Sequence, residues 1–229
     1  MALYALGDLH LSLNSNKSME IFGDGWQDYV LRLKEAFSAL RPEDVTVLCG
    51  DLSWGMSLEE SLEDFRFIDA LPGKKYLLKG NHDYWWNTAA KMERFFREHE
   101  LTTMEILHNN CKFYGELALC GTRGWFYELD NQGTHNEKVL LREIGRLESS
   151  LKAAGEHEKL VFLHYPPLYQ GYRCPEILRL LSAYPVERCC YGHLHGYAIK
   201  RRLEGGWNGT DFSLISADYL GFVPKKICE

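Results

Sequence analysis

Apolar residues along the chain follow two patterns, which alternate over much of its length. Short β-favouring runs lie between segments in which apolar residues recur at helical spacing. The predicted strands cover residues 3–6, 45–49, 75–79, 159–163 and 187–191. The predicted helices cover residues 25–40, 57–71, 87–99 and 134–154, with a further short helix through Ile177 and Leu181. This alternation is typical of an α/β fold with one mixed sheet or two facing sheets and helices outside.

Capping residues indicate where some of these helices begin. Ser57-x-x-Glu60 and Thr134-x-x-Glu137 each match a capping box, in which the two side chains bond to each other's backbone N–H groups. Asn87 is a candidate N-cap, because its side chain can accept a hydrogen bond from the first turn. We therefore expect helices to start at these positions.

Two hairpins and one long loop are predicted outside the alternating part. Residues 112–114 pair with 117–120 in the first hairpin, and residues 197–203 pair with 211–216 in the second. Residues 122–136 show neither period and are too many for an ordinary connection, so we predict a functional loop there.

Side chains that can bind a metal or carry a proton follow five apolar runs. They are Asp8 and His10, Asp51, the run Asn81-His82-Asp83, His164, and the pair His193 and His195. The carboxyl ends of parallel strands meet at one edge of a sheet, where open α/β folds bind their ligands. Alternate side chains of an extended segment face the same way, so the members of each His-containing pair can face one centre. We therefore expect these residues to converge.

Converging carboxylates need a partner of opposite charge. Asp8, Asp51 and Asp83 would lie close together, and like charges at short range resist ionisation unless cations are present. Carboxylate, amide and imidazole donors without a thiolate suit divalent Mn, Fe, Zn or Ni. Any one of the histidines read alone could be an ordinary core residue, but that reading does not explain all of them together. The pattern predicts a pair of divalent cations.

The blocks that carry these residues resemble, in the same order, those of the calcineurin-like metallophosphoesterases. They are Asp8-x-His10, Gly50-Asp51, Gly80-Asn81-His82-Asp83, His164 and Gly192-His193-x-His195. The resemblance implies two β-sheets packed face to face with helices outside, as a four-layer sandwich. It also implies a dinuclear metal centre in which one ion is held by Asp8, His10 and His195, the other by Asn81, His164 and His193, and both by a bridging Asp51.

The resemblance also implies catalytic roles. His82 falls where the family keeps a histidine that is not a ligand but faces the leaving group, and the neighbouring Asp83 would orient it. One block departs from the family: many members continue it as Gly-Asp-x-x-Asp, often followed by arginine, whereas Trp54 stands at the second acidic position here. The metal ligands survive this change, but close kinship with the protein Ser/Thr phosphatases, which keep that acid and arginine, is disfavoured.

Length and composition limit the remaining classes. A chain of 229 residues fits one α/β domain over residues 1–229. A net charge of −6 argues against a broad basic surface for nucleic acid. The sequence has no apolar run of about eighteen residues and no basic start of a signal peptide, so neither a membrane span nor export is expected. Seven cysteines without a C-x-x-C pair indicate reduced thiols in a cytoplasmic protein.

These features predict a hydrolase that cleaves a small-molecule phosphomonoester or phosphodiester, such as a nucleotide, by attack of a metal-bound hydroxide. Arg123, Trp86 and Trp125 border the predicted site and are candidates to bind the substrate, although a salt bridge or core packing would also explain them. Two alternatives stay open: a nuclease that acts on DNA or RNA, and a catalytically silent metal-binding scaffold. His82 favours an enzyme, because a scaffold need not keep it.

Overall fold

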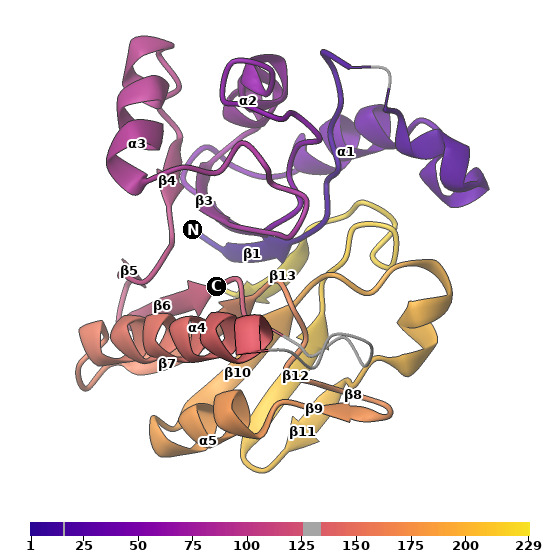
Figure 1. The fold of residues 1–229 in the computed structure, drawn as a ribbon. Coiled ribbons are helices and arrows are strands. Elements are labelled where there is room, and N and C mark those ends of the chain that lie inside the picture. Colours follow the sequence, from indigo (N-terminus) through magenta and orange to yellow (C-terminus); the bar gives the residue numbers. More distant parts are fainter. Residues whose placement is uncertain (16, 126–133) are drawn as a thin grey trace.

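The computed structural model describes residues 1–15, 17–125 and 134–229, without the side chains of residues 134–136. The described residues form two large sheets that face each other, with helices on the outer faces (Figure 1). The first sheet has the order β13 (Lys225–Cys228), β1 (Leu3–Leu6), β2 (Val45–Cys49), β3 (Lys74–Leu78) and β4 (Met104–Ile106). The second has the order β11 (Gly205–Trp207), β12 (Thr210–Leu214), β10 (Val186–Tyr191), β7 (Glu158–Leu163), β6 (Leu117–Thr122) and β5 (Cys111–Tyr114). A small separate sheet pairs β8 (Leu168–Tyr169) with β9 (Tyr172–Arg173).

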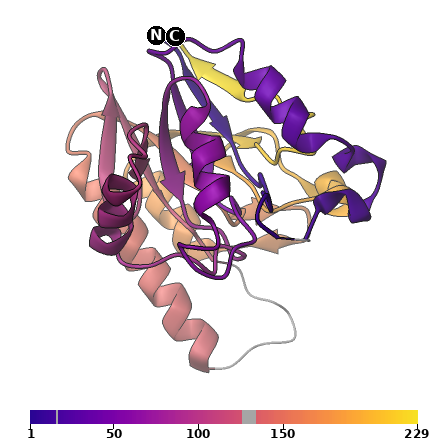
Figure 2. The ribbon, with the colours of Figure 1, turned by 90° about the horizontal axis from the view of Figure 1, so that it is seen from above.

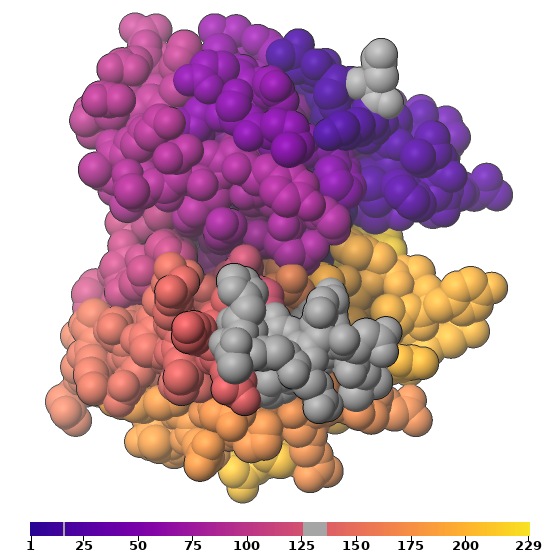
Figure 3. All heavy atoms as spheres, viewed as in Figure 1, coloured from indigo at the N-terminus to yellow at the C-terminus, as the bar shows by residue number. Residues whose placement is uncertain are grey.

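Each sheet has its own helices. Those of the first sheet are α1 (Tyr29–Phe37), α2 (Leu62–Ala70) and α3 (Ala89–Glu98), and those of the second are α4 (Thr134–Ala153) and α5 (Pro175–Ala183). Short 3₁₀ helices cover Met19–Phe22, Asp24–Trp26 and Gly196–Arg201. The two termini lie side by side because β13 pairs antiparallel with β1 (Figure 2). The space-filling view shows the earlier part of the chain, indigo to magenta, above the later part, salmon to yellow (Figure 3).

The core has three layers because the central strands are apolar on both faces. On β1, Leu3 joins the core between the sheets, whereas Leu6 packs against the helices of the first sheet. On β7, Phe162 and Leu163 divide in the same way between the central core and the helices of the second sheet. Strands buried on both sides are typical of parallel sheets covered by helices. The predicted α/β class with two facing mixed sheets is confirmed, and the single domain over residues 1–229 stays a prediction.

The second predicted hairpin is partly wrong. Gly196–Arg201 forms a 3₁₀ helix where a strand was expected at 197–203. The strand that pairs with β12 is instead β11, and between them lie Asn208 and Gly209 with φ values of 48° and 86°. An Asn-Gly pair in the left-handed region makes the tight two-residue turn that suits a hairpin. The turn therefore sets the register and leaves residues 197–203 outside the sheet.

Helices α1 and α3 begin later than predicted. The helix expected at 25–40 is shorter, because Asp28 has a φ of 51° and separates α1 from the preceding 3₁₀ turn. Helix α3 is capped by Thr88, whose Oγ1 accepts a hydrogen bond from the backbone N–H of Lys91 at 3.3 Å, and not by Asn87.

Other local predictions are confirmed or fall elsewhere. The backbone N–H of Glu60 donates to Ser57 Oγ at 3.2 Å, which is one half of the predicted capping box. Glu60 Oε2 accepts instead from the Met56 N–H at 2.9 Å, and α2 begins only at Leu62. The hairpin of β5 and β6 is present. Much of the predicted loop at 122–136, and the side chain of Thr134, lie outside the described residues. Strands β4 and β13, of three and four residues, were not predicted because such short edge strands carry little periodic signal.

Parallel pairing joins β1, β2 and β3 in one sheet and β6, β7, β10 and β12 in the other. The predicted site residues follow the carboxyl ends of these strands. None of the helices in the described part of the chain is long and apolar enough to cross a membrane. The cytoplasmic location expected from the cysteines stays a prediction.

Candidate metal centre

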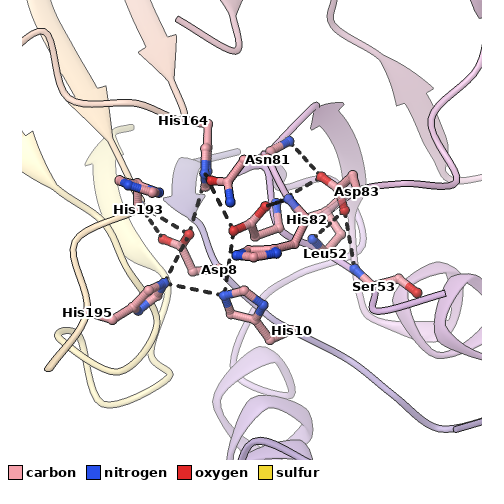
Figure 4. Close-up of polar contacts among 12 residues, drawn as sticks. Asp8, His10, Leu52, Ser53, Asn81, His82, Asp83, His164, His193 and His195 are labelled. Carbon is pink, nitrogen blue, oxygen red and sulfur yellow. Dashed lines mark hydrogen bonds and ion pairs between the residues drawn. The ribbon is translucent and has the colours of Figure 1, made fainter. Parts of the chain in front are cut away.

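The predicted site residues converge where the parallel strands end (Figure 4). The first donor group is Asp8, His10 and His195, and the second donor group is Asp51, His164 and His193. Within each group the ligand atoms lie within 4.8 Å of one another, so one cation could contact all three. Asn81 adjoins the second donor group, since its Oδ1 lies 2.7 Å from His164 Nε2. The structure thus brings all seven residues predicted as ligands into one site.

Asp51 lies between the two donor groups. Its Oδ2 is 3.5 Å from His164 Nε2 in the second group and 3.7 Å from His10 Nε2 in the first. The groups also meet at Asp8, whose Oδ1 is 3.6 Å from His164 Nδ1. A carboxylate in this position can donate to two cations at once, as the centre of a two-metal site requires.

Left-handed backbone conformations turn several of these side chains into the site. Asp8, His10, Asp51 and His193 have positive φ values between 46° and 72°. Residues other than glycine rarely adopt this conformation, and it costs of order 1–3 kcal/mol where the surroundings enforce it. One enforcing contact is direct, since the His193 N–H donates to both carboxylate oxygens of Asp8, at 3.0 and 3.1 Å.

Two glycines beside the site have no room for a side chain. A Cβ atom at Gly192 would lie 2.6 Å from Asp8 Oδ2, and one at Gly80 would overlap the backbone and carboxylate of Asp51. The glycine that opens each of these motifs is therefore a steric requirement of the converging strand ends.

The polypeptide alone leaves charge unbalanced in the site. Asp8 and Asp51 are 0% and 1% exposed. Burial and the charge of Asp8 raise the pKa of Asp51 to about 8. Burial alone would lower the pKa of His195, but the charges of Asp8 and Asp218 raise it to about 10. Without a cation, a proton on His195 would have to balance the charge of Asp8, and divalent cations among these oxygen and nitrogen donors would take its place. The residues present therefore fit a pair of metal ions.

One histidine of each donor group has a fixed partner behind it. His164 Nδ1 lies 3.1 Å from the backbone oxygen of Cys49, and His195 Nδ1 lies 3.0 Å from Asp218 Oδ1. Histidines that bind metals usually donate their other ring N–H in this way, which fixes the tautomer and the ring orientation. Sequence reasoning missed Asp218. It follows the strand predicted at 211–216, but the parallel pairing of that strand, β12, with β10 was not predicted.

The carboxylate of Asp83 faces the backbone, where the sequence had suggested that it orients His82. It accepts hydrogen bonds from the N–H groups of Gly80, Asp51 and Leu52, at 2.6, 2.9 and 2.8 Å, and from Trp85 Nε1 at 3.0 Å. Asp83 thus fastens the loop after β2 to the loop after β3. Successive residues of a chain point to different sides, so adjacency to His82 did not place the two side chains together.

His82 is held by ring contacts. Its ring centroid lies 4.6 Å from that of Trp54 and 5.8 Å from that of His10, and Trp54 also stacks on His10 at 5.1 Å. The Nδ1 atom of His82 is buried and has no hydrogen-bond partner in the described part of the chain. Trp54, which stands where many family members have a second acid, therefore packs against both His10 and His82.

The three predicted substrate-binding residues have different surroundings. Arg123 Nη2 lies 3.4 Å from Glu143 Oε1, and the Arg123 guanidinium lies 4.9 Å from the Trp125 ring. Trp125 packs edge-on against Tyr165, whose ring lies 4.6 Å from that of His193. Arg123 and Trp125 are thus linked to the second donor group.

Trp86 lies in a different cluster. Its ring packs against Trp85 and His108, with centroids 5.2 and 5.6 Å apart, and neither of these is among the predicted ligands. Its assignment to the substrate stays a prediction.

Comparisons with known proteins identify a family and a fold. A family model, calcineurin-like phosphoesterase, matches residues 1–197. The solved structure of AQ665, a protein of unknown function from Aquifex aeolicus, has a TM-score of 0.52 and 16% identity, covering 98% of this chain and 95% of that one. TT1561 of Thermus thermophilus has a TM-score of 0.50 and 13% identity, covering 84% of this chain and 81% of that one. No curated protein matches the sequence. At these identities the structural likeness shows a shared fold.

Proposed function

This chain belongs to the calcineurin-like phosphoesterase family, and we propose that it uses two divalent cations to hydrolyse a phosphate ester of a small molecule. The observation that carries the proposal is the pair of donor groups with a buried Asp51 between them. Two cations so close together suit the displacement of an oxygen at phosphorus, because they can neutralise both the attacking and the departing side.

The proposed ligands follow the donor groups, with Asn81 added to the second group and Asp51 shared. Asp8, His10 and His195 would hold one cation, Asn81, His164 and His193 would hold the other, and Asp51 would contribute to both. Mn, Fe, Zn or Ni suit this mixture of oxygen and nitrogen donors. When bound, such cations neutralise the phosphate and lower the pKa of a water that can attack phosphorus. The buried carboxylates and the backbone turns fix the geometry in advance.

His82 is the residue that we propose to act on the departing oxygen. It belongs to neither donor group, and its side chain is partly exposed, so a substrate can reach it. In its protonated form, His82 would pass a ring proton to the leaving oxygen and return to the neutral imidazole, which avoids release of a charged alkoxide. Trp54 and His10 hold the ring at the edge of the site.

The proposed substrate is a compact ester such as a nucleotide. Arg123 can hold a phosphate oxygen by a charge-assisted hydrogen bond, and the Trp125 ring can stack on a flat group. Both lie on the side of the second donor group, linked to it through Tyr165. A phosphoprotein would not need an aromatic wall for its serine or threonine side chain.

The test is metal-dependent turnover. The protein is stripped with a chelator and reloaded with Mn²⁺, and hydrolysis of 4-nitrophenyl phosphate and of bis(4-nitrophenyl) phosphate is measured before and after. We expect turnover only in the reloaded protein, and its loss in Asp51→Ala. His157→Ala is the matched control, because this histidine is 42% exposed and lies outside both donor groups.

The same assay separates the alternatives. A protein that binds two cations but turns over neither aryl ester, no nucleotide and no oligonucleotide is the silent scaffold. Turnover of oligonucleotides alone identifies a nuclease, a reading that the net charge of −6 disfavours because nucleic-acid binding rests on neutralising phosphates.

A further inference from the structure

Asp218 lies outside the part of the chain that the family model matches, yet it touches the site. Its side chain is 9% exposed. Its Oδ1 lies 3.0 Å from His195 Nδ1 and accepts from the Tyr219 N–H at 2.9 Å, and its Oδ2 accepts from the Gly196 N–H at 3.1 Å. Both oxygens are therefore engaged, and one faces a predicted ligand.

His195 can present only one ring nitrogen to the centre. Its Nε2 lies 3.4 Å from Asp8 Oδ1 and 3.3 Å from His10 Nε2, inside the first donor group. With Nδ1 against a carboxylate, the hydrogen of a neutral imidazole belongs on Nδ1, and the lone pair on Nε2 is free for a cation.

The turn that carries Asp218 is anchored next to the site. The Ala217 N–H donates to the backbone oxygen of Gly7 at 3.0 Å, directly before Asp8 in the sequence. The Phe222 N–H donates to the Ala217 oxygen at 2.8 Å, and the buried Phe222 ring packs edge-on against Trp26 at 5.2 Å. The same turn therefore fixes Asp218 relative to Asp8, a member of the first donor group.

We propose that Asp218 is a positioning residue, which binds the Nδ1–H of His195 and so directs Nε2 to the cation of the first donor group. This inference rests on the proposed function. A competing role is purely structural: the carboxylate could serve only to cap the turn at Gly196 and Tyr219. The two roles differ in what they require of His195.

Cation affinity measured in a double-mutant cycle separates them. Mn²⁺ binding is measured by calorimetry on metal-free wild type, Asp218→Ala, His195→Ala and the double variant. We expect Asp218→Ala to weaken the binding of one of two Mn²⁺ ions by about 10- to 100-fold, which is the usual effect of removing such a partner on metal affinity. We expect no further loss when the change is made in His195→Ala, because the residue acts through that ring.

Two further variants guard the comparison. Asp218→Asn keeps the size and one acceptor and should give an intermediate affinity, and it decides the question if Asp218→Ala does not fold. Asp211→Ala is the matched control, because this acid lies on β12, is 47% exposed and pairs with Arg188. It should bind both ions as wild type does.

Each other outcome overturns the proposal. Wild-type Mn²⁺ affinity in Asp218→Ala would show that His195 needs no such partner. A loss that persists in full in the His195→Ala background would show that Asp218 acts on the turn instead. Failure of the wild-type protein to bind Mn²⁺ would remove the proposed function as well, and is distinguishable because the first measurement shows it.

Discussion

The two donor groups contain the same kinds of ligand atoms, but different parts of the molecule support them. In the second donor group, the backbone oxygen of Cys49, at the end of β2, stands behind His164. In the first, the side chain of Asp218 stands behind His195, and the Trp54 ring stacks on His10. The fixed partner of His164 is thus strand backbone, whereas His195 and His10 are supported by side chains from loops.

This difference predicts how the groups respond to mutation. A backbone carbonyl persists whatever side chain its residue carries, whereas a carboxylate or an indole is lost in a single substitution. The family match also ends before Asp218, so part of the support of the first group lies beyond it. We expect substitutions around the first group to change cation binding while the second group is affected chiefly through its own ligands.

The largest effect should come from the residue that the groups share. Asp51→Ala removes a donor from both groups, so we expect both cations to be lost and the difference between the groups to disappear. We expect kcat/KM to fall about a thousandfold or more, which corresponds to several kcal/mol of lost transition-state stabilisation. Metal content per chain and kcat/KM measure this. Retention of two ions by Asp51→Ala would contradict the shared position.

In the metal-free protein, Asp51 should make the free energy of unfolding depend on pH. The pKa of Asp51 is raised to about 8 in the fold, so between about pH 4 and pH 8 the folded chain keeps a proton that the unfolded chain has lost. This contribution to stability therefore falls as pH rises through that window. Asp51→Asn cannot titrate there, so metal-free Asp51→Asn should lose less stability than metal-free wild type between these pH values. Parallel denaturant midpoints across the window would contradict this.

Much of the site could be predicted because its residues directly follow strands that apolar runs make visible. Position after a parallel strand is a local property, and it places Asp8 and Asp51 at the carboxyl edge of the first sheet and His164 at that of the second. Asp218 depends instead on a turn whose position is set by a hydrogen bond to Gly7 in another part of the chain. No local pattern encodes such a tertiary contact.

The remaining errors have local causes. The expected contact of Asp83 with His82 was implied by the family resemblance, and a motif gives the order of residues but not the direction in which each side chain points. The strand expected at 197–203 rested on composition, whereas the Asn208-Gly209 turn set the pairing. Orientation and register were therefore harder to predict than the existence of the strands.

The next effect concerns the histidine that belongs to neither donor group. His82→Ala should keep both cations but lower kcat for esters with poor leaving groups by roughly a hundredfold, the size of an acid–base contribution. Esters with good leaving groups should lose less, because they need less protonation. Turnover of an alkyl and a nitrophenyl ester, with metal content as control, measures this. Equal losses on both esters, or loss of metal, would assign His82 a different role.

A smaller effect should test the aromatic support of the first donor group. Trp54 stacks on His10 and packs on His82, and such aromatic pairs contribute about 0.5–1.5 kcal/mol each. Trp54→Ala should therefore lower kcat about threefold to tenfold and weaken one cation, whereas Trp54→Phe keeps a ring and should lose less. If Trp54→Ala weakens the binding of both cations equally, Trp54 does not support the first donor group in particular.

The smallest effect should fall on substrate choice and leave the cations in place. The Trp125 ring contacts Tyr165, and the Arg123 side chain contacts Glu143 and Trp125, none of which is a predicted ligand, so Trp125→Ala should bind both cations as wild type does. Loss of a stacking surface should lower kcat/KM for a nucleotide ester by about threefold to tenfold, and that for a small aliphatic ester hardly at all. Arg123→Ala should lower both, because it removes a contact to phosphate.

Trp86→Ala serves as the internal comparison for this prediction. Its ring packs on Trp85 and His108, so a loss of activity that is equal for the two esters would place it in the core, whereas a selective loss on the nucleotide would place it in the substrate pocket. For Trp125 the same selectivity is required. An equal change on both esters would show that the Trp125 indole supports Tyr165 and His193 and does not contact the organic part of the ester. The organic part of the substrate would then not bind on the side of the second donor group.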